Sequence, residues 1–268
     1  GVAGAGYATV LAQLISCVCC FAFIAKKLPI LHLHRQDWKI TRQDLTSHMR
    51  IAFPMGFQSS IIAMGTLILQ TALNGLGATA VASYTAASKV DQLAVMGLMS
   101  FGMTMATFTA QNYGAGKISR IRKGVKQCLL ISIILSVVMT FVNIVFGKYL
   151  VRLFVGNTEN VINLAQVYLI INSSCYFILA VLFVIRYTLQ GLGKSFVPTF
   201  AGIMELVMRT VAALVLVAPF GFAGASASNP LAWIGSAVPL CIAYVHTMRR
   251  MPKEDCPPQT TPEGISAP

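Results

Sequence analysis

Residues 125–146 read VKQCLLISIILSVVMTFVNIVF, and the only charged side chain among them is Lys126. A helix needs about 20 apolar residues to cross the roughly 30 Å hydrocarbon core of a bilayer, so this stretch predicts a transmembrane helix. Six similar stretches recur along the chain, at residues 2–25, 51–73, 90–113, 161–187, 195–218 and 229–248. The pattern predicts an all-α, polytopic membrane protein with about seven transmembrane helices.

Composition supports the same fold class. Charged residues make up 10% of the chain and hydrophobic residues 56%, and the mean hydropathy is +0.72. Soluble domains usually carry about a quarter charged residues. Lipid offers no partner for exposed backbone groups, so spanning segments fold as helices or closed barrels. A barrel needs short segments of alternating polarity, and no stretch here alternates in that way. We therefore expect no separate soluble domain.

The net charge of +12 indicates orientation in a membrane rather than contact with nucleic acid. If the seven stretches alternate in direction, three basic residues lie on one side, Arg209 lies inside a stretch, and the other sixteen share the opposite side. These sixteen are Lys26, Lys27, Arg35, Lys39, Arg42, Arg50, Lys117, Arg120, Arg122, Lys123, Lys126, Arg186, Lys194, Arg249, Arg250 and Lys253. Short loops rich in Lys and Arg stay in the cytoplasm. The C-terminus is therefore predicted to be cytoplasmic, with the basic loops near anionic lipid headgroups.

Cysteine and histidine positions indicate neither a metal site nor an enzyme. The chain has seven cysteines, and Cys17, Cys19 and Cys20 lie in the middle of an apolar stretch without metal-ligand partners. A buried thiol behaves there as a small hydrophobic side chain. The four histidines lie near the predicted cytoplasmic boundary, at His32, His34, His48 and His246. An intramembrane enzyme needs paired catalytic groups at depth, so we expect no catalytic residues, no metal and no cofactor.

A short self-match predicts the domain organisation. Residues 1–5, GVAGA, resemble residues 221–225, GFAGA, at an offset of 220 residues. Because transporters are commonly built from internal repeats, we interpret the first and seventh stretches as equivalent helices, each the last of a six-helix unit. Residues 1–25 would then end a preceding lobe whose remainder is absent here. Residues 26–50 would form a cytoplasmic linker, 51–250 a complete C-terminal lobe, and the Pro-rich residues 251–268 a disordered tail.

Several motifs, in order along the chain, carry a resemblance to a known family. Residues 110–117 read AQNYGAGK, similar to the Gly-Gln-Asn-x-Gly-Ala-Gly signature of the multidrug and toxic compound extrusion (MATE) family, with Ala110 in place of the usual Gly. Residues 51–54 read IAFP, followed by Gln58, as in the seventh MATE helix. Residues 189–194 read LQGLGK, as after the tenth helix. Glu205 and Arg209 are placed as in the eleventh, and the Gly221-x-x-Gly224 spacing before Trp233 resembles the start of the twelfth.

The resemblance implies the C-terminal part of a MATE transporter, from its sixth helix to its twelfth. It implies export of amphipathic or cationic drug-like compounds in antiport with H⁺ or Na⁺, by alternating access of two lobes. The implied location is a cell membrane, the bacterial inner membrane in particular. The implied partner is the N-terminal lobe of the same chain, which would hold most of the coupling-ion site.

Polar groups inside the apolar stretches are the candidate functional residues. Glu205 and Arg209 are spaced for an i, i+4 ion pair, either structural or a proton-linked switch. Asp91 is expected to be a solvated residue at the outer mouth, with a coupling carboxylate as the alternative. Pro54 removes a backbone hydrogen bond and predicts a kink. The substrate-cavity candidates are Gln58, Gln70, Asn74, Asn172 and Tyr176. Methionines, including Met96, Met99, Met103 and Met105, offer adaptable apolar contacts.

The residues of the signature turn, Gln111, Asn112, Gly114 and Gly116, are predicted to cap a helix at the cytoplasmic side, with gating as the alternative. Two other functions keep the same fold. A lipid-linked oligosaccharide flippase of the superfamily would need several cations in its cavity for pyrophosphate, whereas only Arg209 is expected to be buried. An inactive half-transporter is the second alternative, because one lobe has no opposite wall.

Overall fold

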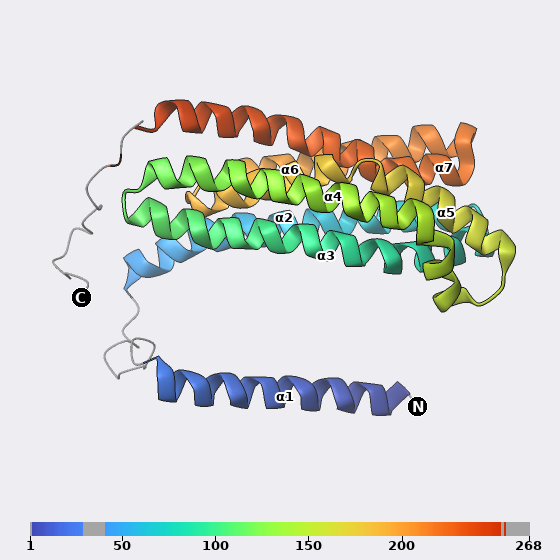
Figure 1. Cartoon of the computed structure of the whole chain (residues 1–268), viewed down its shortest axis with the longest axis horizontal. Coiled ribbons are helices and arrows are strands. Elements are labelled where there is room, and N and C mark those ends of the chain that lie inside the picture. The colour runs from blue at the N-terminus through green and yellow to red at the C-terminus, as the bar shows by residue number, and fades with distance from the viewer. Residues whose placement is uncertain (1, 29–40, 253–254, 256–268) are drawn as a thin grey trace. The chain divides into compact units, whose positions relative to one another are not determined.

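The structure is a computed structural model that describes residues 2–28, 41–252 and 255 (Figure 1). All regular elements among these residues are helices, so the predicted all-α fold is confirmed. They are α1 (Val2–Lys27), α2 (Arg42–Asn74), α3 (Ala78–Gly114), α4 (Ile118–Val155), α5 (Glu159–Ser173), α6 (Tyr176–Gly191) and α7 (Phe196–Arg250). The chain divides into two compact units, residues 1–49 and 50–268.

The predicted seven stretches all fall on helices, but the helix boundaries differ from the expectation in two places. The stretch 161–187 is divided between α5 and α6, and the stretches 195–218 and 229–248 both fall on α7. Among the described residues, five helices are long and apolar enough to cross a membrane, and α5 with α6, bent by 51° between them, make a sixth candidate span. The 55-residue α7 contains one non-helical residue, Gly221, which divides it into two helices. At 1.5 Å per residue, α7 has a path of about 80 Å, enough for two crossings. Counting these two halves separately gives the predicted seven.

The helices extend beyond the predicted hydrophobic stretches. α3 begins at Ala78, twelve residues before the predicted position 90, and α4 runs from Ile118 to Val155 rather than over 125–146. Hydropathy marks only the part of a helix that lies in hydrocarbon. The polar residues at both ends remain helical because their backbone groups still gain the helical hydrogen bonds.

Several polar side chains are buried inside the 50–268 unit, while many large apolar side chains face outward. On α4, Ser132, Ser136 and Asn143 are buried, whereas Ile134 and Phe141 are 56% and 61% exposed. This arrangement is the reverse of a soluble protein and suits a lipid-facing surface. In α1, which belongs to the other unit, the described side chains are exposed apart from half-buried Ile24, as suits an apolar spanning helix.

Two hydrophobic clusters hold the 50–268 unit together. The first joins α3, α4, α6 and the second half of α7 around Leu98, Ile121, Leu182 and Leu240. The second joins the end of α2 with α3, α4, α5 and the middle of α7, around Leu69, Leu73, Val151, Tyr168 and Leu169. Figure 1 shows α3 and α4 side by side along most of their length. The clusters therefore hold α3, α4 and α7 at two separate places along their length.

Two polar contacts lie in the segments that flank the spans. Thr41 and Asp44 form a capping box at the start of α2: each residue's side chain accepts a hydrogen bond from the other's backbone N–H, at 3.2 and 3.3 Å. Most of the predicted linker (29–40) and tail (253–254 and 256–268) lie outside the described residues. Asp255 accepts hydrogen bonds from the backbone N–H and the hydroxyl of Ser119, which hold the pKa of its carboxyl below the ordinary value.

Two turns with the same hydrogen bonds end α3 and α6. After α3, Gly116 has φ 70° and donates to Tyr113 O at 3.0 Å, and Lys117 donates to Asn112 O at 2.8 Å. After α6, Gly193 has φ 73°, and the N–H groups of Gly193 and Lys194 make the equivalent bonds. This pair of bonds around a left-handed glycine is the Schellman helix end.

Replacing Gly116 with Ala should destabilise the chain by about 1 kcal/mol, because an L side chain is strained at this positive φ. The measurement is the thermal unfolding midpoint of the purified protein in detergent. Gly114→Ala is the matched control, since Gly114 is the last helical residue and a Cβ there meets no atom within 4 Å. Equal midpoints for the two variants would contradict the assigned turn.

Candidate functional site

A cavity of about 400 Å³ lies inside the 50–268 unit, between α2, α3, α6 and α7. Most of its wall is apolar and includes Met99 and Phe183. Its polar and aromatic lining includes Gln58, Ser59, Arg186, Tyr187, Gln190, Glu205 and Trp233. Apolar walls with a few convergent polar groups are typical of small-molecule sites.

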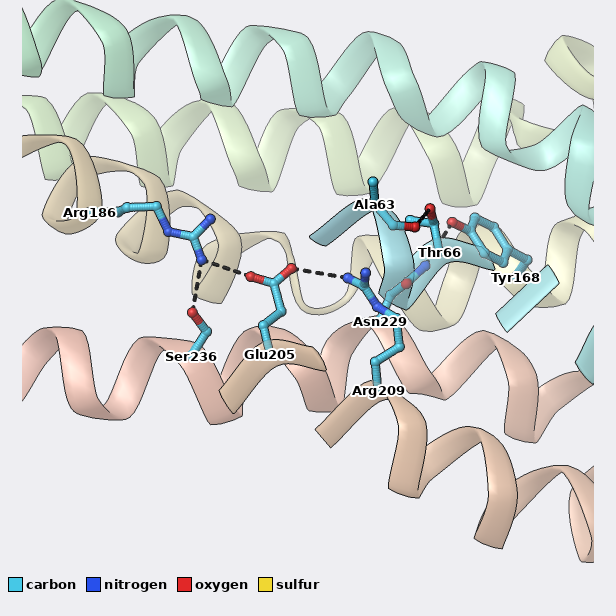
Figure 2. Close-up of polar contacts among 8 residues, drawn as sticks. All are labelled: Ala63, Thr66, Tyr168, Arg186, Glu205, Arg209, Asn229 and Ser236. Carbon is cyan, nitrogen blue, oxygen red and sulfur yellow. Dashed lines mark hydrogen bonds and ion pairs between the residues drawn. The ribbon is translucent and has the colours of Figure 1, made fainter. Parts of the chain in front are cut away.

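Glu205 binds two arginines at the wall of this cavity (Figure 2). Arg186 Nη2 donates to Glu205 Oε2 at 2.7 Å, and Arg209 Nη2 donates to Glu205 Oε1 at 3.1 Å. Arg186 Nη2 also donates to Ser236 Oγ at 2.8 Å. All three charged residues are at most 5% exposed. The cluster therefore joins α6 to both halves of α7.

The position of Arg186 corrects a prediction. The sequence placed Arg186 in a basic loop between two stretches, and Arg209 was expected to be the only buried cation. Arg186 instead lies inside α6 and is 5% exposed. Arg186 can be buried because Glu205 compensates its positive charge, which the surrounding apolar side chains cannot do. Without Arg186, fifteen basic residues remain on the predicted cytoplasmic side, against three on the opposite side, so the charge bias is kept.

Close packing between α2 and α7 positions the second arginine. A Cβ on Gly65 of α2 would lie 3.1 Å from Arg209 Nη1, and one on Gly202 of α7 would lie 3.0 Å from Gln58 Cγ. The two glycines thus leave room for a guanidinium and an amide side chain between the helices. Gln58 also accepts a hydrogen bond from Gln190 Nε2 at 3.3 Å, which links α2 to α6 beside the cavity.

A second buried polar cluster surrounds Asp91. Tyr168 donates to Asp91 Oδ2 at 3.4 Å and Tyr176 donates to Asp91 Oδ1. Asn143 donates to the Tyr176 hydroxyl at 2.9 Å, and Asn229 to the Tyr168 hydroxyl at 3.2 Å, the latter visible in Figure 2. Among the described residues, no lysine or arginine forms an ion pair with Asp91.

The prediction that Asp91 is solvated at the outer mouth is wrong. Asp91 is 7% exposed, because α3 begins a full twelve residues before the predicted stretch and continues past Asp91 on both sides. The aromatic rings of Tyr168 and Tyr176 cover the carboxylate, and their hydroxyls replace the water that it would otherwise bind.

The structure brings one of the five predicted substrate residues to the cavity. Gln58 lines it. Gln70 and Asn74 lie further along α2 and bond to each other at 3.4 Å. Asn172 is fully buried and donates to the backbone oxygens of Tyr168 and Ser226. Tyr176 belongs to the Asp91 cluster. Substrate contact at these positions stays a prediction.

The remaining predicted residues lie at helix ends and helix contacts. Asn112 donates to Phe108 O at 2.7 Å within α3, and Gln111 O accepts from the Ala115 N–H at 3.1 Å. Pro54 lies inside α2, and its carbonyl oxygen accepts a hydrogen bond from the Thr199 hydroxyl at 3.0 Å. That contact ties α2 to the start of α7.

Sequence reasoning missed Arg186, Tyr187, Gln190 and Trp233 as cavity residues. For Arg186 a signal existed: it follows the nine apolar residues 177–185 and precedes the Gly191 turn by more than one helical turn. An ionisable group in such surroundings is a functional candidate. No sequence signal separates Trp233 or Tyr187 from ordinary aromatic packing residues.

Glu205→Gln should destabilise the protein by about 3 kcal/mol or more, because it leaves two buried guanidinium groups without a counter-ion. Thermal unfolding in detergent measures the loss. Glu159→Gln is the matched control: Glu159 pairs with Arg152 at 4.0 Å, with 79% and 47% of the two side chains exposed. Such surface pairs contribute about 1 kcal/mol at most. If Glu205→Gln lowers the unfolding midpoint as little as Glu159→Gln does, the Glu205 cluster does not stabilise the fold.

Comparisons with known proteins agree on one fold and one family. The chain is 22% identical over 209 residues to the probable multidrug resistance protein YoeA of Bacillus subtilis, covering 77% of this chain and 45% of that protein. It is 22% identical over 245 residues to the probable multidrug resistance protein NorM of Thermotoga maritima, covering 88% and 49%. The chain thus spans a little under half the length of these relatives.

Solved transporters share the fold. A variant of the Vibrio cholerae MATE transporter VcmN superposes with a TM-score of 0.83 at 18% identity, covering 92% of this chain and 56% of that one. A MOP superfamily transporter from Pyrococcus furiosus gives 0.69 at 21% identity, covering 76% and 45%. The MatE family model matches residues 54–215, more than half of the chain. The resemblance read from the motifs is therefore confirmed, and the chain belongs to the MatE (MATE) family.

Proposed function

We propose that this chain supplies one six-helix lobe, residues 51–250, of a secondary active multidrug efflux transporter in a bacterial inner membrane. The transporter exports amphipathic or cationic organic compounds in antiport with H⁺ or Na⁺, by alternating access between this lobe and a preceding N-terminal lobe that α1 would complete. The observation that carries the proposal is the cavity of about 400 Å³ inside a lobe whose outer face is apolar. Its size suits a drug-sized molecule.

The relatives support the transport class. Two curated relatives are described as probable multidrug resistance proteins, and a third, from Staphylococcus saprophyticus, as a multidrug export protein at 20% identity. Gln58, Gln190 and Trp233 are the cavity residues best suited to fix the orientation of a substrate, and Met99 offers an adaptable apolar contact. A transport role leaves catalytic residues unnecessary.

Asp91 is the residue of this lobe that we propose exchanges the coupling ion, in addition to a main site in the preceding lobe. Protonating Glu205 would leave Arg186 and Arg209 without a counter-ion, whereas Asp91 has no cationic partner among the described residues. Protonation of Asp91 would weaken the bond donated by Tyr176, the first residue of α6 after the 51° bend. Ion binding at Asp91 would thus change the stability of the bend between α5 and α6.

The inactive half-transporter remains the second candidate. It is favoured by the length of the chain, which covers 45% of the YoeA relative. Alternating access needs two repeats that move against each other. A single lobe could bind a substrate but has no opposite wall to close.

Asp91→Asn should reduce ion-driven efflux, because Asp91 is proposed as a coupling site in addition to the main one in the preceding lobe. The assay follows ethidium loss from energised cells and from vesicles with an imposed H⁺ or Na⁺ gradient, using the complete reading frame that contains this chain. Asn preserves the shape of the side chain but cannot exchange a proton. The gradient that restores wild-type efflux identifies the coupling ion.

Asp44→Asn is the matched control, since Asp44 is an exposed capping residue of α2, and it should leave efflux unchanged. The 268-residue chain expressed alone forms the other arm. Efflux by the Asp91→Asn variant at the wild-type rate would remove Asp91 from coupling. Efflux by the chain alone would overturn the need for a second lobe.

Membrane orientation follows from the basic loops and can be measured directly. Cysteines introduced at Thr79 and Lys117 lie at exposed positions at opposite ends of α3. We expect a membrane-impermeant maleimide to label Thr79→Cys from outside intact cells, and Lys117→Cys only after the membrane is opened, because positively charged loops stay in the cytoplasm. The reverse labelling pattern would invert the proposed topology and place the C-terminus outside.

A further inference from the structure

We infer that the chain directly after α7 forms a strap across the end of the lobe that is predicted to be cytoplasmic. The strap consists of two mutual helix caps, which open and close together. In one cap, Asp255 binds the first turn of α4. In the other, Arg122 of that same turn binds the last carbonyl oxygens of α7. The inference concerns how this end of the lobe is held, and it does not rest on the proposed transport.

The first turn of α4 has no acidic cap of its own. Its N-cap residue, Lys117, makes no side-chain capping hydrogen bond, and residues 118–121 contain no acidic side chain. The first N–H groups of a helix need acceptors, and the helix dipole favours an anion there. Asp255 supplies both. Its Oδ1 accepts from the Ser119 N–H at 2.9 Å, and its Oδ2 accepts from the Ser119 hydroxyl at 3.0 Å.

The end of α7 is the complementary case. α3 and α6 end with a left-handed glycine, whereas the residue after α7, Met251, is extended, with φ −77° and ψ 147°. The last carbonyl oxygens of α7 are therefore not bound as in a Schellman end. Arg122 Nη2 donates to Met248 O at 2.6 Å, to Met251 O at 3.2 Å and to Pro252 O at 3.4 Å. A cation also suits the negative end of the helix dipole.

The two caps connect helices whose main packing partners lie elsewhere. α4 packs most closely against α3, α5 and α6, and α7 against α5 and α6. In Figure 1 the start of α4 and the end of α7 lie at the same end of the unit. Ser119 and Arg122 are three residues apart, so they lie on one side of α4. Their partners all belong to residues 248–255. Each cap therefore holds this short segment where the other cap needs it.

Charge favours the closed strap. The hydrogen bonds from Ser119, together with the nearby charges of Lys117 and Arg120, hold the pKa of the Asp255 carboxyl below its ordinary value. The carboxylate is therefore ionised at neutral pH. Because Asp255 is exposed, salt should weaken its attraction to the basic residues. The Debye length falls from about 10 Å at 0.1 M salt to about 3 Å at 1 M.

Hydrogen exchange followed by mass spectrometry tests the strap, using the complete reading frame that contains this chain, in nanodiscs. Arg122→Gln should speed exchange in the last turn of α7 about tenfold, as for the loss of a hydrogen bond from a charged group. Lys123→Gln is the matched control, because it removes the same charge from the same turn at an exposed position. It should leave the end of α7 unchanged.

The decisive variant is Asp255→Ala. It should speed exchange of the Ser119 amide, and also of the last turn of α7, which the Asp255 hydrogen bonds do not reach. Two independent caps would predict a change at the start of α4 alone, and that result would overturn the strap. Asp44→Ala is the control: it removes an exposed capping carboxylate from α2 and should leave both ends of the strap unchanged.

The unmutated protein provides a test that does not depend on the folding of any variant. Raising the salt from about 0.1 M to about 1 M should speed exchange at the start of α4 and the end of α7 together. Amides around the buried Ser136, in the middle of α4, should not respond. Exchange that stays constant at both ends would contradict the strap. Neither readout involves efflux, so a failure of the proposed transport would leave this inference standing.

Discussion

The carboxylate of Glu205 is the contact on which the arrangement of this lobe depends. It compensates two arginines that come from different helices, Arg186 on α6 and Arg209 on α7, inside a unit whose outer face is apolar. Because lipid cannot solvate either guanidinium, both must point inward and meet the same carboxylate. Ser236 then binds Arg186 from the second half of α7, and Gly65 of α2 leaves space for Arg209. Four helical segments are thereby fixed around one charge.

The Asp91 cluster is a second polar centre that shares α6 with the first. Tyr176 begins α6 and donates to Asp91, and Arg186 lies ten residues further along the same helix, about 15 Å away. In the proposed coupling, the bend of 51° directly before Tyr176 would serve as a hinge about which α6 tilts. A change at Asp91 would then reach the cavity wall through the helix itself, without a chain of intervening side-chain contacts. This part of the proposal depends on the described lobe alone.

The sequence was sufficient for features that follow from local chemistry. Hydropathy located the spans, the i, i+4 spacing of Glu205 and Arg209 predicted their pair, and the glycine at 116 predicted the left-handed end of α3. It was insufficient wherever a distant partner decides the environment. Arg186 reads as a loop cation until Glu205, nineteen residues later, is known to face it. Asp91 reads as solvated until Tyr168 and Tyr176 are known to cover it. Whether a charged side chain is buried depends on the partner that it meets in the fold, and hydropathy or spacing along the sequence does not identify that partner.

The second buried arginine also changes the comparison between substrate classes. A flippase seemed unsuited to this chain because only one cation was expected at depth, and that reason no longer holds. The balance of charge now supplies a better one. Both arginines bind Glu205, and Asp91 is a second buried carboxylate in the same unit. Among the described residues, two buried cations therefore face two buried carboxylates, and no excess positive charge is left to bind a pyrophosphate. Burying the two negative charges of a lipid-linked sugar without a counter-ion would be strongly unfavourable, so the described lobe is poorly suited to a lipid-linked oligosaccharide.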